Sequence, residues 1–148
     1  MNYRNWKKCY PPNEAATKEE YYYRLLSYPD HFWLLRDGNN ITAFINEPVT
    51  NYDTIYDEMN HDPSFHHEDG LYQAILGVNT DPLYQNQGYA SKIMKQVISD
   101  AKKQGRKGCI LICKKELIAY YQKFGFKNYG ISKSSLANQT WYDLKLLF

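Results

Sequence analysis

The feature that most constrains the fold is an amphipathic segment between residues 88 and 104. Its apolar residues recur at i, i+3, i+4, i+7, i+8 and i+11, the spacing of one face of an α-helix. They are Ala90, Ile93, Met94, Val97, Ile98 and Ala101. Gly105 follows at the place where a helix favours glycine. An apolar run precedes this helix at 71–80 and another follows it at 109–113, so a strand, a helix and a strand are predicted.

The remaining elements flank this unit on both sides. Thr17 and Glu20 fit a capping box that predicts a helix as far as residue 27. A turn signal at 37–40 joins two strands as a hairpin. The predicted elements outside the central unit are the helix 17–27, the strands 31–36 and 41–49, a short helix near 53–59, a helix at 115–124, and strands at 126–129 and 139–147. This order predicts a mixed α/β sheet covered by helices.

Length and composition predict one domain spanning residues 1–148, with a hydrophobic content of 43% and a charged content of 23%. The net charge of +2 does not favour a nucleic-acid partner. No apolar run reaches the roughly 18 residues of a membrane span, and the first residues lack the apolar region of a secretory signal. We therefore expect no membrane association and a cytoplasmic protein.

The cysteines and tyrosines carry little functional information. The chain has an odd number of cysteines, Cys9, Cys109 and Cys113, which indicates reduced thiols. No neighbouring residues would complete the four ligands of a zinc site. We expect no metal site. The 15 tyrosines suit half-buried clefts, but a compositional bias explains most of them.

The turn between the 71–80 strand and the 88–104 helix is a candidate anion site. Backbone N–H groups at a helix start point outward, and the helix dipole there favours negative charge. Gly88 lets an anion approach the backbone, and Ala90 keeps the next turn narrow. Such a loop can hold a pyrophosphate, although it lacks the residues of a P-loop and the three glycines of a dinucleotide fingerprint. An ordinary strand-to-helix turn is the alternative.

Two motifs resemble the GNAT N-acetyltransferase superfamily. Thr80-Asp-Pro82 followed by Gln85-Asn-Gln-Gly88-Tyr-Ala90 looks like its acetyl-CoA signature. The segment 119–126, Ala-Tyr-Tyr-Gln-Lys-Phe-Gly-Phe, resembles its Tyr-x-x-x-Gly-Phe element. The resemblance implies a mixed, mostly antiparallel central sheet flanked by helices. It also implies acetyl-CoA as cosubstrate and a small-molecule amine as acceptor.

Over residues 9–148 the chain resembles bacterial relatives of arylalkylamine N-acetyltransferases. The segments that carry this resemblance are 57–59, 66, 69–70, 72–73, 113–118, 121, 124–126, 130–134 and 141–143. Two histidines of the animal enzymes correspond to Ala74 and Leu76. Only eight residues precede the segment at 9–11, so the family's first strand is either absent or supplied by another chain. The exposed edge would then be covered by residues 1–10 or by a second copy in a homodimer.

The resemblance also implies a cofactor site. Backbone groups of Val78, Asn79 and Thr80 would bind the pantetheine. The loop N–H groups would bind the pyrophosphate. The loop residues in this prediction are Gln85, Asn86, Gln87, Gly88, Tyr89 and Ala90.

Catalysis by direct transfer needs an acid for the thiolate and a base for the amine. Tyr121 aligns with the family's acid, with aromatic packing as the alternative, whereas Tyr120 points about 100° away on a helix and is expected to pack. His66 is the candidate base. It belongs to a polar cluster at 66–69, and the alternative interpretation of this cluster is a solvated loop without a catalytic role.

Three other acidic residues and one cysteine have lesser expected roles. Glu47, Asp57 and Glu58 are weaker candidates, as anchors for a cationic substrate. Cys113 is expected to pack rather than to act as a nucleophile.

Two alternatives to a small-amine N-acetyltransferase remain open. One is a non-catalytic or weakly catalytic acyl-CoA-binding regulatory module, which the lost histidines and first strand favour. The other is a protein N-terminal or lysine acetyltransferase. The retained Tyr121 and the intact loop at 85–90 favour the small-amine enzyme.

Overall fold

The computed structural model describes residues 16–148, which form two β-sheets with helices around them. The first sheet has the order β1 (Phe32–Asp37), β2 (Asn40–Asn46), β5 (Asn79–Thr80). The second has the order β3 (Val49–Thr50), β4 (Tyr72–Ile75), β6 (Gly108–Cys113), β8 (Tyr142–Leu147), β7 (Lys127–Ile131). Among these strand pairs only β4 with β6 is parallel. The predicted mixed, mostly antiparallel α/β fold is therefore confirmed.

Over residues 16–148 the strands are accompanied by three α-helices and several short 3₁₀ turns. The α-helices are α2 (Lys18–Ser27), α3 (Tyr89–Lys103) and α4 (Ile118–Gln122). The 3₁₀ turns are Asp57–Asn60, Pro63–Phe65, Pro82–Tyr84, Lys115–Leu117 and Leu136–Asn138. The predicted capping box at the start of α2 is present, with Thr17 and Glu20 bonded reciprocally. Within residues 16–148, none of the helices has the length and hydrophobicity that a membrane span requires.

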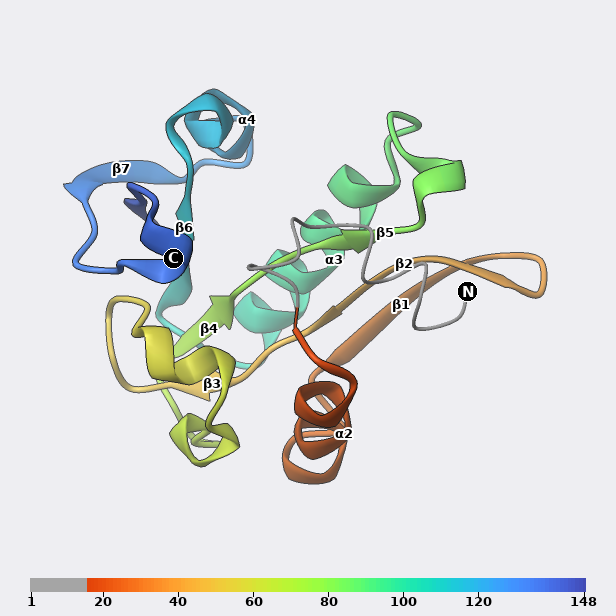
Figure 1. Cartoon of the computed structure of the whole chain (residues 1–148), viewed down its shortest axis with the longest axis horizontal. Coiled ribbons are helices and arrows are strands. Elements are labelled where there is room, and N and C mark those ends of the chain that lie inside the picture. Colours follow the sequence, from red (N-terminus) through yellow and green to blue (C-terminus); the bar gives the residue numbers. More distant parts are fainter. Residues whose placement is uncertain (1–15) are drawn as a thin grey trace.

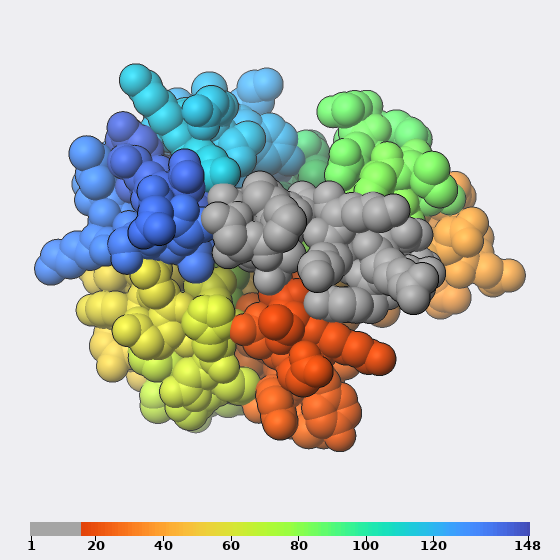
Figure 2. Space-filling model, viewed as in Figure 1, coloured from red at the N-terminus to blue at the C-terminus, as the bar shows by residue number. Residues whose placement is uncertain are grey.

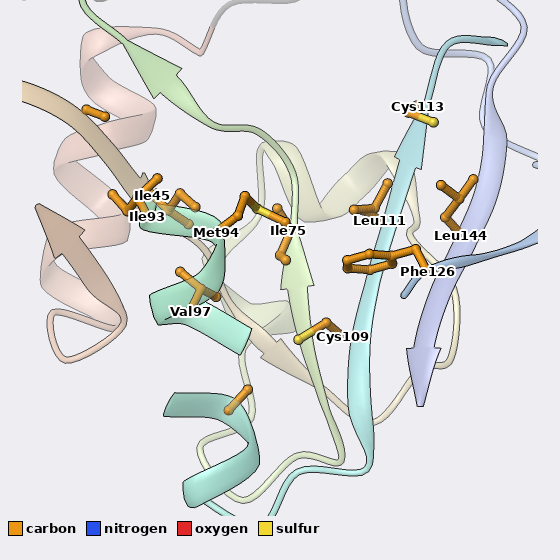
Figure 3. Close-up of a cluster of buried hydrophobic side chains, with 12 residues drawn as sticks. Ile45, Ile75, Ile93, Met94, Val97, Cys109, Leu111, Cys113, Phe126 and Leu144 are labelled. Carbon is orange, nitrogen blue, oxygen red and sulfur yellow. The ribbon is translucent and has the colours of Figure 1, made fainter. Parts of the chain in front are cut away.

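The main core lies between α3 and the two sheets. Figure 1 shows α3 running behind β4 and β5. In Figure 3 its Ile93, Met94 and Val97 point toward Ile45 and Ile75. Complete burial of each such side chain contributes roughly 1.5–3 kcal/mol relative to exposure. The amphipathic pattern that predicts α3 therefore also accounts for how the helix holds both sheets together.

Two strands predicted as continuous are interrupted. The expected strand at 71–80 is β4 and β5, with residues 76–78 unpaired in either sheet. The expected strand at 41–49 is β2 and β3, separated at Glu47 and Pro48. The two interruptions lie side by side, because the Gly77 backbone N–H donates to the Glu47 carboxylate at 3.1 Å. Pro48 has no N–H to donate to a neighbouring strand. A hydrogen bond to a side chain thus replaces ladder bonds at this place.

The helix predicted over 115–124 and the last strand are shorter than expected, whereas the strand predicted over 126–129 extends to Ile131. The helix predicted over 115–124 is a 3₁₀ turn followed by α4, which ends at Gln122. Of the last two strands, β7 starts at Lys127 and β8 at Tyr142. The expectation that residues 1–10 or a second copy cover the sheet edge lies outside the described residues.

Candidate active site

The site is built on the divergence of two neighbouring strands. Parallel pairing between β4 and β6 ends with Ile75 opposite Leu111. Beyond Ile75 the chain crosses to the first sheet, where Thr80 pairs with Ala43 of β2. Figure 1 shows β5 continuing toward one side while β6 rises away from it. The gap between β5 and β6 separates the two sheets.

Alternate residues of this crossing segment line two different cavities. Gly77 and Asn79 line a cavity of about 280 Å³ between the sheets, which we name the splay cavity. Val78 and Thr80 line a cavity of about 310 Å³ beside the start of α3, which we name the loop cavity. Successive residues of an extended chain point to opposite faces, so the two cavities lie on opposite faces of this segment.

The loop cavity gathers most of the predicted cofactor residues. Those that line it are Val78, Thr80, Gln85, Asn86, Gly88, Tyr89 and Ala90. Asn79 lines the splay cavity instead, and Gln87 donates from its side-chain amide to the Leu83 carbonyl at 3.2 Å. Figure 2 shows the loop before α3, in green, at the surface of the molecule.

Gly88 gives the loop cavity its open backbone. It is the N-cap of α3 with φ +85°, a left-handed conformation that residues with a side chain rarely adopt. A Cβ built there meets no atom within 4 Å, so it would project into open space. With no side chain to cap the first turn of α3, that turn presents backbone donors and the positive end of the helix dipole.

Glu47 is the buried carboxylate of the splay cavity, with 2% of the residue exposed. One oxygen accepts from the Gly77 N–H, whereas Oε2 has no hydrogen-bond partner among the described residues. Arg24 Nη1 lies 3.9 Å from Oε2. Burial raises the pKa of Glu47 to about 8, although Arg24 and the backbone act in the opposite direction. This carboxylate therefore exchanges a proton close to neutral pH.

Burial of Glu47 predicts a pH-dependent stability. Its pKa is higher in the folded chain than the usual 4.5, so the folded state binds more protons between these values. We expect the contribution of Glu47 to the free energy of unfolding to be largest below about pH 4.5. This contribution should be lost as pH rises through about 8. Denaturant titrations of the native protein and of Glu47→Gln should show a smaller decline for the variant. Equal declines would contradict a raised pKa at Glu47.

Tyr121 lines the same cavity as Glu47. It lies on α4, partly buried, with its ring 6.1 Å from that of Phe126 in the core. Burial raises the pKa of its hydroxyl above the ordinary value of 10, so the phenol keeps its proton at neutral pH. The residue thus packs near the core and also lines the cavity.

Tyr120 packs as expected, with its ring 5.4 Å from that of Phe124, and it also makes a polar contact. Its hydroxyl lies 3.2 Å from Ser91 Oγ, and the residue lines the loop cavity. Adjacent tyrosines thus line different cavities, as helical spacing predicts. The contact with Ser91 has no signal in the sequence near Tyr120, because Ser91 belongs to α3.

His66 does not line either cavity. Its Nδ1 accepts from the Val49 backbone N–H at 3.0 Å, and its Nε2 lies 2.9 Å from Glu68. Burial lowers its pKa. Nδ1 therefore ties the 66–68 segment to Val49 of β3, and Nε2 contacts Glu68 within that segment, so neither nitrogen faces the cavity that Glu47 and Tyr121 line.

The other candidate residues lie elsewhere. His31, His66 and Glu68 form a group with the spacing of metal ligands. Because His66 Nδ1 accepts from the Val49 N–H, its Nε2 carries the proton of the neutral ring, and a protonated nitrogen does not bind a metal ion. Asp57 accepts from the Ser134 hydroxyl in a separate cavity, which Glu58 also lines. Burial raises the pKa of the Cys113 thiol to about 11, consistent with its expected packing role.

Comparison with known families decides the assignment. A model described as "Acetyltransferase (GNAT) family" matches residues 1–126. The chain belongs to the GNAT acetyltransferase family. Comparison with curated proteins finds no match, so the narrower resemblance to arylalkylamine N-acetyltransferases has no support there.

Solved structures share this fold at low sequence identity. A GphF GNAT-like decarboxylase in complex with isobutyryl-CoA has a TM-score of 0.78 at 15% identity, covering 97% of this chain and 91% of that one. A GNAT family acetyltransferase from Elizabethkingia anophelis with acetyl-CoA bound has a TM-score of 0.66 at 17% identity, covering 100% and 91%. The ribosomal-protein-S18-alanine N-acetyltransferase from Escherichia coli has a TM-score of 0.65 at 15% identity, covering 98% and 84%.

Proposed function

We propose that this GNAT family member transfers an acetyl group from acetyl-CoA directly to a primary amine. The observation that carries the proposal is the placement of Glu47 and Tyr121 around one cavity between the diverging strands. The loop cavity, with Gly88 at the helix start, lies on the opposite face of the same segment. A cosubstrate held in the loop cavity would therefore extend its reactive end through the gap toward this pair.

Acetyl-CoA would be held by backbone groups rather than by charged side chains. The first-turn N–H groups of α3 and the loop before it suit the pyrophosphate. Backbone groups of residues 78–80 suit the pantetheine amides. Two of the solved structures named above contain an acyl-CoA, which supports acyl-CoA as the cosubstrate. The proposed cofactor residues are those of the sequence prediction, with Asn79 and Gln87 contributing through the backbone.

In the proposed chemistry, Glu47 accepts a proton from the acceptor's ammonium group. The neutral amine then attacks the thioester carbonyl, and the C–S bond breaks as the tetrahedral intermediate collapses. Tyr121 donates its proton to the departing CoA thiolate. The amine's second proton reprotonates the tyrosinate by way of solvent, and Glu47 releases its proton to solvent, so both groups are restored and one proton is released in each transfer. We propose Glu47 in place of His66 as the base, because Glu47 lines the same cavity as Tyr121 and His66 does not.

Gly88→Val is expected to abolish binding of acetyl-CoA. A β-branched side chain at φ +85° strains the turn and adds bulk at a residue that lines the loop cavity. The native protein should melt at a higher temperature with CoA, since a ligand that binds only the folded state stabilises it. Thermal melting with and without CoA measures both effects. Gly38→Val, at another left-handed turn, is the matched control that should keep the CoA-induced shift.

A non-catalytic acyl-CoA-binding module is the competing function. A thiol-release assay with acetyl-CoA and a panel of aryl and alkyl amines separates the two. Release of CoA that depends on the amine supports the enzyme. CoA-induced stabilisation without release on any amine, peptide or lysine acceptor would favour the module.

A further inference from the structure

Arg24 is the one buried side chain of α2, and it lines the splay cavity together with Glu47. Only 5% of it is exposed. Among the described residues its guanidinium donates a single hydrogen bond, from Nη2 to the Asn60 carbonyl at 3.1 Å. Its Nη1 lies 3.9 Å from Glu47 Oε2, beyond hydrogen-bond distance. The cavity thus contains a buried cation whose planar set of five donors is mostly uncommitted.

Such a pair is a poor structural ion pair. Burying two charges is costly, and the attraction compensates only when the hydrogen bonds are short and complete. Here Glu47 Oε2 has no hydrogen-bond donor among the described residues, and the Arg24 fork has no bidentate acceptor. A ligand with one positive and one negative group, placed between them, would satisfy both.

An α-amino acid has those two groups on a single carbon. Its amine would donate to Glu47 Oε2, and its carboxylate would accept from the Arg24 fork, the geometry that arginine favours. A simple amine leaves Arg24 without a partner. A peptide N-terminus presents a neutral carbonyl at the same place. The separation of 3.9 Å between the two protein groups suits neighbouring substituents of one carbon.

The rest of the splay cavity is largely apolar and aromatic. The side chains concerned are Tyr21, Leu76, Ile112, Leu117, Leu136 and Trp141. Trp141 donates its Nε1–H to the Leu136 carbonyl at 2.8 Å, so the ring needs no polar partner from a ligand. These walls suit a bulky hydrophobic side chain.

We infer that the acceptor is a free α-amino acid with a large apolar or aromatic side chain, oriented by Arg24 with its amine at Glu47. The inference rests on the proposed function for its chemical outcome. The binding of the amino acid does not depend on the proposed function. In this arrangement Arg24 is a specificity-determining residue, since it selects for a carboxylate beside the amine that reacts.

Binding to the CoA complex tests the inference without chemistry. Isothermal titration of the CoA-saturated full chain would compare L-phenylalanine, L-phenylalaninamide and phenethylamine, and likewise L-leucine, L-leucinamide and isopentylamine. Within each set only the carboxylate changes. We expect the amino acid to bind at least about tenfold tighter than the other two, the worth of a charge-assisted hydrogen bond.

Substitution of Arg24 provides the second measurement. Arg24→Gln should remove the preference for the carboxylate, and Arg24→Lys should restore part of it because the charge remains. Arg36→Gln, at an exposed arginine on β1, is the control that should leave the preference unchanged. Melting curves establish that each variant is folded. If Arg24→Gln does not fold, the comparison of ligands on the native chain and on Arg24→Lys still tests whether Arg24 selects for the carboxylate.

The outcomes separate this inference from the proposed function. Equal binding within both sets, or no binding of any member, would overturn the amino-acid acceptor. Carboxylate-dependent binding without release of CoA from acetyl-CoA would support the ligand class and overturn the transferase. Acetylation of phenethylamine with no preference for L-phenylalanine would support the transferase and overturn this acceptor.

Discussion

Replacement of Tyr121 by phenylalanine is expected to lower the turnover number of acetyl transfer by about 10²-fold, within the usual range for general acid catalysis. Phenylalanine keeps the ring that packs near Phe126 and removes only the hydroxyl of the splay cavity. Affinity for acetyl-CoA should change little, because the loop cavity is intact. Such a loss marks an interaction made mainly in the transition state. Steady-state kinetics would measure the turnover number, and the CoA-induced shift in melting temperature would report on cosubstrate binding.

Two further tyrosine variants control this experiment. Tyr129→Phe, on the exposed face of β7, should leave turnover and CoA binding unchanged. Tyr120→Phe removes the contact with Ser91 in the loop cavity, so we expect a higher KM for acetyl-CoA with little change in turnover. Full turnover in Tyr121→Phe with the chemical step rate-limiting would assign Tyr121 to packing alone.

Replacement of Glu47 by glutamine should lower kcat/KM at neutral pH by about 10²-fold or more. Glutamine keeps the shape and an oxygen that accepts from the Gly77 N–H, but it cannot take a proton from the amine. A base must be deprotonated to act, so native kcat/KM should rise with pH through about 8, the pKa of Glu47. The variant should lack that rise. Profiles of kcat/KM against pH for both proteins give the comparison.

Glu58→Gln and His66→Gln discriminate between candidate bases. Glu58 is exposed and lines a different cavity, so its variant should keep the native pH profile. His66→Gln should lower the melting temperature, because the Val49 N–H loses its acceptor, yet it should retain the rise near pH 8. Loss of that rise in His66→Gln but not in Glu47→Gln would reverse the assignment of the base.

Tertiary contacts decide the direction of each candidate side chain. Helical geometry predicts that Tyr120 and Tyr121 diverge, and they line different cavities. The pattern around His66 gives no indication that both its ring nitrogens are committed to structure. Glu68 is a local neighbour of His66, but Val49 becomes one only when the 66–68 segment packs against β3.

Local signals in the sequence determined the main elements and the glycine turn before α3. The 3.6-residue spacing over 90–101 specifies α3, Thr17 and Glu20 specify the start of α2, and Gly88 specifies the left-handed turn at the start of α3. These signals are readable because the interactions involved join residues a few positions apart. The family motif at 80–90 covers the loop before α3 and its first residues, and the motif at 119–126 covers α4 and the turn after it.

The proposed base was decided by tertiary structure alone. Arg24, Glu47 and Gly77 come from a helix, a strand end and a break between strands, and nothing local distinguishes Glu47 from a solvated acid at the end of a hairpin. Its burial, and hence its raised pKa, exists only once α2 covers the place where β2 and β4 are interrupted. A pKa depends on desolvation and on charges from distant segments, so spacing along the chain cannot reveal it.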